Sequence, residues 1–310
     1  MKNGVGSKLN KSSVGEIYQK YGIFLIMIIV FLGACIANPN FLKASNLTNV
    51  MKQITAVAVI AAGETILLVS GCIDLSASAV AAVSSCFAAN ALLQTNSVIV
   101  CFAVAMLIGI VLNYISGSMI TWFKLPPFIA TLAIMSLAEG MSYLYSGGKT
   151  IKGLDKLKWL SQGKLFDFIP NMLVLLALVL ILMQFMLKRT RLGLYMYAIG
   201  GNLKASIAAG INVNRILRLT YVINGALVGI AGLILTSRMM AATPNITTGG
   251  YEFDAITATV VGGTSFSGGH GIINNVMILM GLDSNWQTIA KGLLIAVAVI
   301  IDINTKKSNK

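Results

Sequence analysis

Residues 97–123 have the sequence SVIVCFAVAMLIGIVLNYISGSMITWF and contain no Asp, Glu, Lys, Arg or His. A helix rises about 1.5 Å per residue, so a helix of this length would extend about 40 Å. That is enough to cross the roughly 30 Å hydrocarbon core of a lipid bilayer. Long uncharged apolar runs are typical of transmembrane helices, and this stretch therefore predicts a membrane protein.

Similar apolar runs recur along the rest of the chain. They lie at about 22–37, 53–70, 73–93, 126–145, 170–187, 216–236, 253–264, 272–282 and 286–303. Strands of a transmembrane barrel would instead alternate apolar and polar residues in segments of about ten residues. Apart from such a barrel, only an α-helix satisfies all of its backbone hydrogen bonds in lipid. We therefore expect an all-α polytopic membrane protein with about ten transmembrane or re-entrant helices.

The composition agrees with this fold class. Hydrophobic residues make up 56% of the 310 residues, and charged residues only 11%, whereas soluble domains carry roughly 25% charged residues. The net charge is +13, but the basic residues lie in loops and tails between apolar runs. We interpret them as charges that orient the chain in the bilayer, and we expect no nucleic-acid partner.

The basic residues also predict the domain organisation. One transmembrane domain, 21–303, would follow a cytoplasmic tail at 1–20 and precede another at 304–310. With the N-terminus inside, most of the 23 Lys and Arg residues fall on the cytoplasmic side, as the positive-inside rule requires. The polar stretch 146–169 would then lie outside and 188–215 inside.

Residues for catalysis are scarce. The chain has one histidine and ten acidic residues, and these form no pattern of metal ligands or of a catalytic triad. We expect no enzyme activity, no metal and no cofactor. The glycine-rich stretch 262–271 lacks the Gly-Lys-Ser/Thr of a phosphate-binding loop, so any ATP would have to be hydrolysed by another subunit.

Three acidic residues lie in or beside apolar runs, where charges are costly and often functional. Asp74 follows a break at Gly71, and we expect it near the cytoplasmic interface in a cap or loop role. Glu64 and Glu139 lie deeper. Either could line a solute path, pair with a polar neighbour or be protonated.

The cytoplasmic stretch 188–215 contains the signals of a short helix. Asn202 is a favourable N-cap, residues 203–209 are compatible with a helix, and Gly210 is a favourable C-terminal stop. Gly200 and Gly201 would form a hinge before it. The alternative is an ordinary cytoplasmic loop.

Small residues predict where helices pack closely. Gly225 and Gly229 form a GxxxG pair, and Gly109 and Gly117 lie on one helix face with Asn113 between them. Such residues let helix backbones approach each other in lipid. We expect a packing role for these glycines, with pore lining as the alternative.

Several short motifs occur in a characteristic order. They are Ile73-Asp-Leu-Ser76, KLPPFIATL at 124–132, YAIGGN at 197–202 with AGI at 209–211, VVGGT at 260–264 with Gly268-Gly269, and Trp286-Gln287 with Lys291-Gly292. Together, from about residue 20 to 303, they resemble the permease subunits of bacterial ribose/xylose-type ABC sugar importers.

The resemblance implies a multi-pass permease of the bacterial cytoplasmic membrane. Two permease subunits, as a homo- or heterodimer, would form the path in the lipid bilayer, a cytoplasmic ATPase subunit would drive it, and an extracytoplasmic sugar-binding protein would deliver a simple sugar. The region that docks on the ATPase corresponds to Gly200, Gly201, Asn202, Ala205, Ala209 and Gly210. Candidate residues of the substrate path are Glu64, Phe128, Glu139 and Asn224.

The chain also departs from the family pattern. Glu64, Cys72 and Glu139 are atypical, and the run 272–282 would give a helix of only about 16 Å where the family has a full span. Two alternatives therefore stay open. One is a stand-alone secondary carrier or facilitator with Glu64 and Glu139 as coupling groups, and the other is a transport-inactive homologue with a shortened span.

Overall fold

The computed structural model of the chain describes residues 32, 35–36, 41–262 and 264. The expected spans at 272–282 and 286–303, and most of 22–37, lie outside the described residues. The chain divides into two units, Met1–Asn49 and Val50–Lys310. In the first unit, the side chain of Asn46 donates a hydrogen bond to the carbonyl of Phe41 (2.9 Å).

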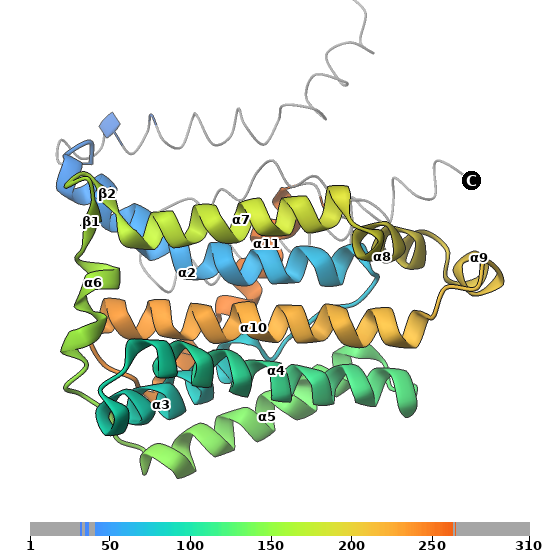
Figure 1. Cartoon of the computed structure of the whole chain (residues 1–310), viewed down its shortest axis with the longest axis horizontal. Coiled ribbons are helices and arrows are strands. Elements are labelled where there is room, and N and C mark those ends of the chain that lie inside the picture. The colour runs from blue at the N-terminus through green and yellow to red at the C-terminus, as the bar shows by residue number, and fades with distance from the viewer. Residues whose placement is uncertain (1–31, 33–34, 37–40, 263, 265–310) are drawn as a thin grey trace, which may run out of the picture. The chain divides into compact units, whose positions relative to one another are not determined.

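The described part of the chain is almost entirely helical, which confirms the all-α polytopic class (Figure 1). Six of its helices are long and apolar enough to cross a membrane. They are α2 (Ala44–Val69), α3 (Ala77–Thr95), α4 (Val98–Trp122), α5 (Pro127–Ser146), α7 (Asn171–Arg189) and α10 (Val213–Met239). A shorter helix, α11 (Tyr251–Val261), covers most of the apolar run expected at 253–264.

The ends of these helices follow from local sequence. Ser97 caps α4 by accepting a hydrogen bond from the backbone N–H of Val100, which satisfies one of the free donors of the first turn. Pro127 occupies the first turn of α5, and Gly147 ends that helix in the left-handed conformation. These are the positions where proline and glycine are favoured.

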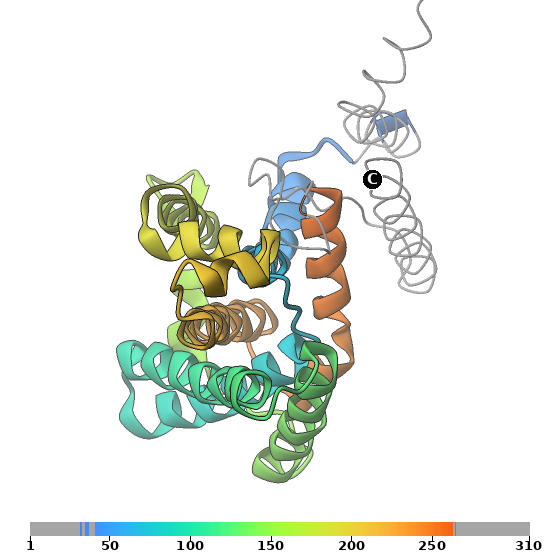
Figure 2. The same ribbon diagram turned by 90° about the vertical axis from the view of Figure 1, so that its right-hand side faces the viewer.

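Helix α10 is the central element of the second unit. It packs against α4 most extensively and also against α3, and Figure 2 shows it enclosed by the other helices. At the crossing with α4, a Cβ atom on Gly109 would lie 2.1 Å from the carbonyl oxygen of Gly225. A Cβ atom on Gly229 would lie 2.3 Å from the carbonyl oxygen of Ala105. The two backbones are therefore in direct contact, as small residues permit.

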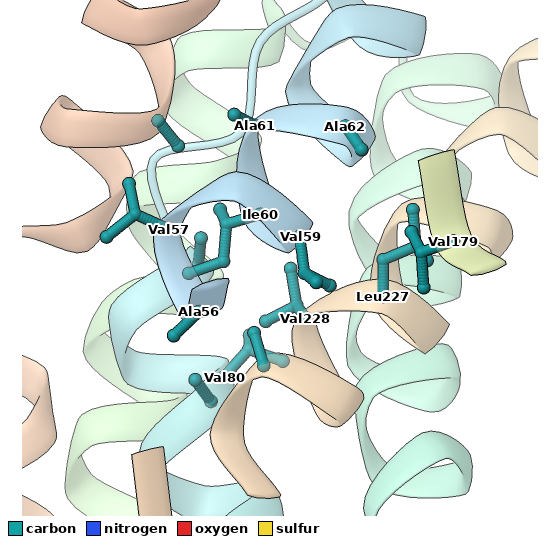
Figure 3. Close-up of a cluster of buried hydrophobic side chains, with 14 of the residues drawn as sticks. Ala56, Val57, Val59, Ile60, Ala61, Ala62, Val80, Val179, Leu227 and Val228 are labelled. Atoms are coloured by element: carbon teal, nitrogen blue, oxygen red, sulfur yellow. The ribbon is translucent and has the colours of Figure 1, made fainter. Parts of the chain in front are cut away.

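The apolar core joins four helices (Figure 3). Ile60 of α2, Val80 of α3 and Val228 of α10 are fully buried, and Val179 of α7 packs beside Leu227 of α10. In contrast, α7 exposes a stripe of large apolar side chains on its other side, comprising Val174, Leu178, Ile181, Leu182 and Phe185. In a membrane protein such a stripe is suited to contact with lipid.

The structure corrects one expectation about the segments between spans and adds detail to two others. The run 73–93 is not helical throughout, because residues 70–76 form a non-helical break with Gly71 at φ +76° and α3 begins only at Ala77. The stretch 146–169 contains η1 (Asp155–Leu157), α6 (Lys158–Ser161) and most of the antiparallel hairpin of β1 (Lys164–Leu165) and β2 (Ile169–Pro170). The stretch 188–215 contains two helices, α8 (Arg191–Gly201) and α9 (Leu203–Ala208).

Candidate functional site

The break between α2 and α3 positions Asp74. The carboxylate of Asp74 is fully buried, and its Oδ1 accepts hydrogen bonds from the backbone N–H (2.8 Å) and the hydroxyl (2.5 Å) of Ser76. This is the local loop role expected for Asp74. The complete burial of the carboxylate was not expected from its position in the sequence.

The second oxygen of Asp74 makes a long-range contact. Asn224 of α10 donates from Nδ2 to Asp74 Oδ2 (2.8 Å) and to Oδ1 of Asn113 on α4 (3.1 Å). All three side chains are fully buried. The break is thereby joined to two transmembrane helices by polar groups in the interior of the protein.

Glu64 of α2 belongs to the same group of side chains. Its Oε2 accepts a hydrogen bond from the backbone N–H of Asp74 (3.4 Å), and the side chain is fully buried. Next to it, Gly63 lies so close to α10 that a Cβ atom there would be 2.1 Å from Asn224 Oδ1. We call Glu64, Asp74, Asn113 and Asn224 the polar cluster.

The polar cluster has unused hydrogen-bonding capacity. Within the described part of the chain, Glu64 Oε1, Asn113 Nδ2 and Asn224 Oδ1 have no hydrogen-bond partner. An unpaired buried polar group costs about 1–3 kcal/mol. Buried ionisable groups in membrane proteins usually face a bundle interior or a water-filled path. Within the described residues the cluster therefore has one free donor, Asn113 Nδ2, and two free acceptors, Glu64 Oε1 and Asn224 Oδ1.

Three further hydrogen bonds hold the surroundings of the polar cluster in place. The hydroxyl of Tyr221 on α10 donates to the carbonyl of Ile73 in the break (2.9 Å). At the start of α3, the hydroxyl of Ser78 accepts from the backbone N–H of Tyr251 (2.9 Å) and donates to the carboxylate of Glu252. Both Tyr221 and Glu252 are almost completely buried.

Sequence reasoning did not select Tyr221 and Glu252 as functional candidates. The signal that could have identified Glu252 is its position immediately before the apolar run 253–264. The acids that the sequence did identify also lie in or beside apolar runs. No comparable signal existed for Tyr221, because a tyrosine within an apolar helix is common and its partner lies in a distant segment.

The expected path residues fall into two separate groups. Glu64 and Asn224 both contact Asp74 and so belong to the polar cluster. Phe128 and Glu139 lie on α5, about three turns apart and therefore on one face of that helix. The side chain of Phe128 is exposed and Glu139 is half-buried. The structure joins Glu64 and Asn224 through Asp74, whereas Phe128 and Glu139 share a helix face but lie about 16 Å apart along it.

The short helix expected after Asn202 is present as α9, and it is capped at its start. The side chain of Asn202 accepts a hydrogen bond from the backbone N–H of Ala205 (3.0 Å). Gly200 and Gly201 do not form a free hinge, because they are the last two residues of helix α8. The chain changes direction at Asn202, whose extended backbone separates α8 from α9.

The end of α9 is also closed by its backbone. Gly210 adopts φ +77°, and the N–H of Ile211 donates to the carbonyl of Ser206 (3.0 Å). This bond is typical of a helix that ends in a left-handed residue. Ala205, Ala209 and Gly210 are exposed, as are the apolar side chains of Leu203 and Ile207. The helix is therefore a rigid projection with apolar groups on its surface.

The fold and the site define a polytopic membrane protein with an internal polar site. Six described helices are long enough to cross a membrane, the polar cluster is buried among them, and the exposed helix α9 lies between α7 and α10 in the sequence. The chain belongs to the family described as "Branched-chain amino acid transport system / permease component", whose model matches residues 46–301. It is a multi-pass permease subunit of the bacterial cytoplasmic membrane.

Curated relatives resemble the chain over nearly its whole length. The ribose import permease protein of Bacillus subtilis is 37% identical, over 92% of this chain and 93% of the relative. The L-arabinose transport system permease protein of Escherichia coli is 31% identical, over 99% and 98%. The galactose/methyl galactoside import permease protein of Escherichia coli is 31% identical, over 96% and 97%. No solved structure gives a significant match.

Proposed function

We propose that this chain is the permease subunit of an ATP-driven importer that carries a simple sugar into the cell. The observation that carries the proposal is the similarity to three sugar permeases over at least 92% of the chain. The substrates for which these relatives are named are monosaccharides or a simple glycoside. The buried polar cluster supports the proposal, because sugars are recognised through hydrogen bonds to their hydroxyls.

In the proposed mechanism, α9 docks on a cytoplasmic ATPase subunit. The exposed apolar side chains of Leu203 and Ile207 suit such a contact, and the caps at both ends of α9 suit the transmission of force. Only residues 209–212 separate α9 from α10. Because α10 carries Asn224, a displacement of α9 would change the position of Asn224 relative to Asp74 and Glu64.

The proposed substrate path passes the polar cluster and the exposed face of α5. Glu64 and Asn224 would offer hydrogen bonds to the sugar. Phe128 and Glu139 would face the path where a second permease subunit packs, because a half-buried acid within an apolar helix is costly against lipid. An extracytoplasmic sugar-binding protein would deliver the substrate at the other face of the membrane.

Reconstitution with the native ATPase and binding protein in proteoliposomes tests the proposal. Uptake of labelled ribose, xylose, arabinose or galactose should require ATP, the ATPase and the binding protein together. Uptake driven by a proton gradient without the ATPase would instead identify a secondary carrier. A complete complex that binds sugar and hydrolyses ATP but moves none of these sugars would identify a transport-inactive homologue.

A further inference from the structure

The hairpin before α7 presents two aromatic side chains at its tip. β1 and β2 pair Lys164 with Pro170 and Leu165 with Ile169. Between the strands, Phe166 is 77% exposed and Phe168 is 70% exposed. Burying a phenylalanine side chain is worth about 1.5–3 kcal/mol relative to leaving it in water. Two such side chains on one short turn indicate a surface that is covered in the native environment.

The backbone of this turn is strained at an aromatic residue. The N–H of Phe168 donates to the carbonyl of Leu165 (3.4 Å), which closes a turn whose two central residues, Phe166 and Asp167, have φ of 53° and 63°. Turns with two positive φ angles normally use Asn and Gly, and positive φ is an outlier for a bulky residue. Backbone strain of this kind costs of order 1–3 kcal/mol per residue and persists only where the surrounding structure imposes it.

The base of the hairpin is fixed to the end of a membrane span. The N–H of Asn171, the first residue of α7, donates to the carbonyl of Gly163 (3.0 Å), and its side chain donates to the carbonyl of Trp159 (2.6 Å). Gly163 leaves no space for a side chain, because a Cβ atom would lie 2.1 Å from the carbonyl oxygen of Trp159. The tip therefore has a defined position relative to α7 (Figure 1).

The tip lies next to the first residue of a helix that is long and apolar enough to cross a membrane. Strand β2 continues directly into α7, whose exposed apolar stripe, which includes Ile181 and Phe185, is suited to the hydrocarbon core. Extended residues advance about 3.4 Å each, so Phe168 lies within about 10 Å of the start of the span. The headgroup layer on each side of a bilayer is about 5–7 Å thick, and Phe168 is therefore within reach of it.

We propose that residues 164–170, the aromatic hairpin, are a membrane-interface anchor. Phe166 and Phe168 insert into the boundary between headgroups and acyl chains at this end of the helices. The exposed ammonium group of Lys164 pairs with lipid phosphates, as basic side chains next to spans do. The proposal is independent of the transported solute, and it fixes the depth at which α7 lies in the bilayer.

Single-tryptophan fluorescence in lipid nanodiscs tests the anchor in the full chain. Trp122, Trp159 and Trp286 are replaced by Phe, and Phe166→Trp or Phe168→Trp is introduced. Phe168→Trp keeps the test possible if the strained position does not tolerate tryptophan. Ile181→Trp, at an exposed position in the middle of α7, is the lipid control, and Ile207→Trp, at a similarly exposed position on α9, is the aqueous control.

Tryptophan at 166 or 168 should emit at shorter wavelength than the Ile207→Trp control. Lipids brominated high on the acyl chain should quench it more strongly than lipids brominated near the methyl end, and the Ile181→Trp control should show the opposite order. Quenching by aqueous iodide equal to that of Ile207→Trp would overturn the proposal. So would an aqueous signal that becomes shielded only when the sugar-binding protein is added, because the hairpin would then be a protein-docking site.

Discussion

At the scale of single residues, Gly109 and Gly225 set the distance between α4 and α10. Gly225→Ala should lower the free energy of unfolding by about 1–3 kcal/mol, the usual cost of overpacking. The physical reason is that the new Cβ atom would lie 2.2 Å from the carbonyl oxygen of Gly109, where only a backbone shift can make room. Thermal unfolding in detergent measures the effect.

Gly140→Ala is the matched control for this substitution. Gly140 also lies within a transmembrane helix, but among the described residues no atom outside its own helix backbone lies within 4 Å of the position of its Cβ. Because alanine is the better helix former by about 1 kcal/mol, this variant should be as stable as the parent or more so. Equal melting temperatures for the two variants would contradict the close contact of the two helices.

The bond between Asp74 and Asn224 can be tested by a double-mutant cycle. Asn224→Ala and Asp74→Ala should each destabilise the protein, because each leaves a buried partner without its hydrogen bond, at about 1–3 kcal/mol. The double variant should lose less than the sum of the two, since side chains in contact show coupling energies of about 0.5–3 kcal/mol. Additive losses would show that the two side chains do not interact.

At the scale of elements, α9 is the segment whose coupling role can be separated from folding. Gly210→Ala forces a side chain into φ +77°, and Asn202→Ala removes a cap worth about 0.5–2 kcal/mol. We expect both variants to reach the membrane and to lose sugar uptake more strongly than ATP hydrolysis. The measurements are uptake and hydrolysis in the same proteoliposomes.

Ser97→Ala provides the comparison for these two variants. Ser97 is the N-cap of α4, where its side chain accepts from the backbone N–H of Val100, so the substitution removes a cap of the same kind outside residues 200–210. The substitution should leave uptake coupled to hydrolysis. Unchanged uptake in Gly210→Ala and Asn202→Ala would show that the ends of α9 do not need to be rigid.

Elements differed in how well the sequence predicted them. The uncharged run at 97–123 predicted α4 almost to its ends, and Asn202 and Gly210 predicted α9, because cap chemistry is local. Helix α8 was missed, since Arg191, Gly200 and Gly201 interrupt its apolar pattern. The available signal was Thr190, whose hydroxyl caps α8 by accepting from the N–H of Gly193 (3.2 Å).

The polar cluster could be predicted only in part. Glu64 and Asp74 were identified as costly intramembrane acids from their apolar surroundings. The hydrogen bond from Asn224 to Asp74 could not be inferred, because the two residues are 150 positions apart in sequence. Helical periodicity shows which face of a helix is apolar, but it does not show which other helix that face meets.

At the scale of the whole molecule, the orientation in the membrane remains a prediction. Segment α6 and helix α9 lie at opposite ends of α10 (Figure 1). With Cys35 replaced by Ser, Lys152→Cys should react with a membrane-impermeant maleimide added outside intact cells, and Lys204→Cys should react only after the cells are opened. Both lysines are exposed.

The three remaining cysteines give a low background for this labelling experiment. Cys72, Cys86 and Cys101 are buried, so the parent with Cys35 replaced should stay unlabelled under both conditions. Labelling of Lys204→Cys from outside intact cells would reverse the orientation that the positive-inside rule predicts.

Helix α10 is one continuous helix that connects α9 at one end with the segment around Leu157 at the other. With 27 residues it is about 40 Å long. It connects to α9 at one end, and near the other the hydroxyl of Ser237 donates to the carbonyl of Leu157 (2.7 Å). The glycine contact at Gly225 lies between these two points. Because the helix is stiff, a displacement of α9 at one end would be carried along the length of α10 to the contact with Leu157 at the other.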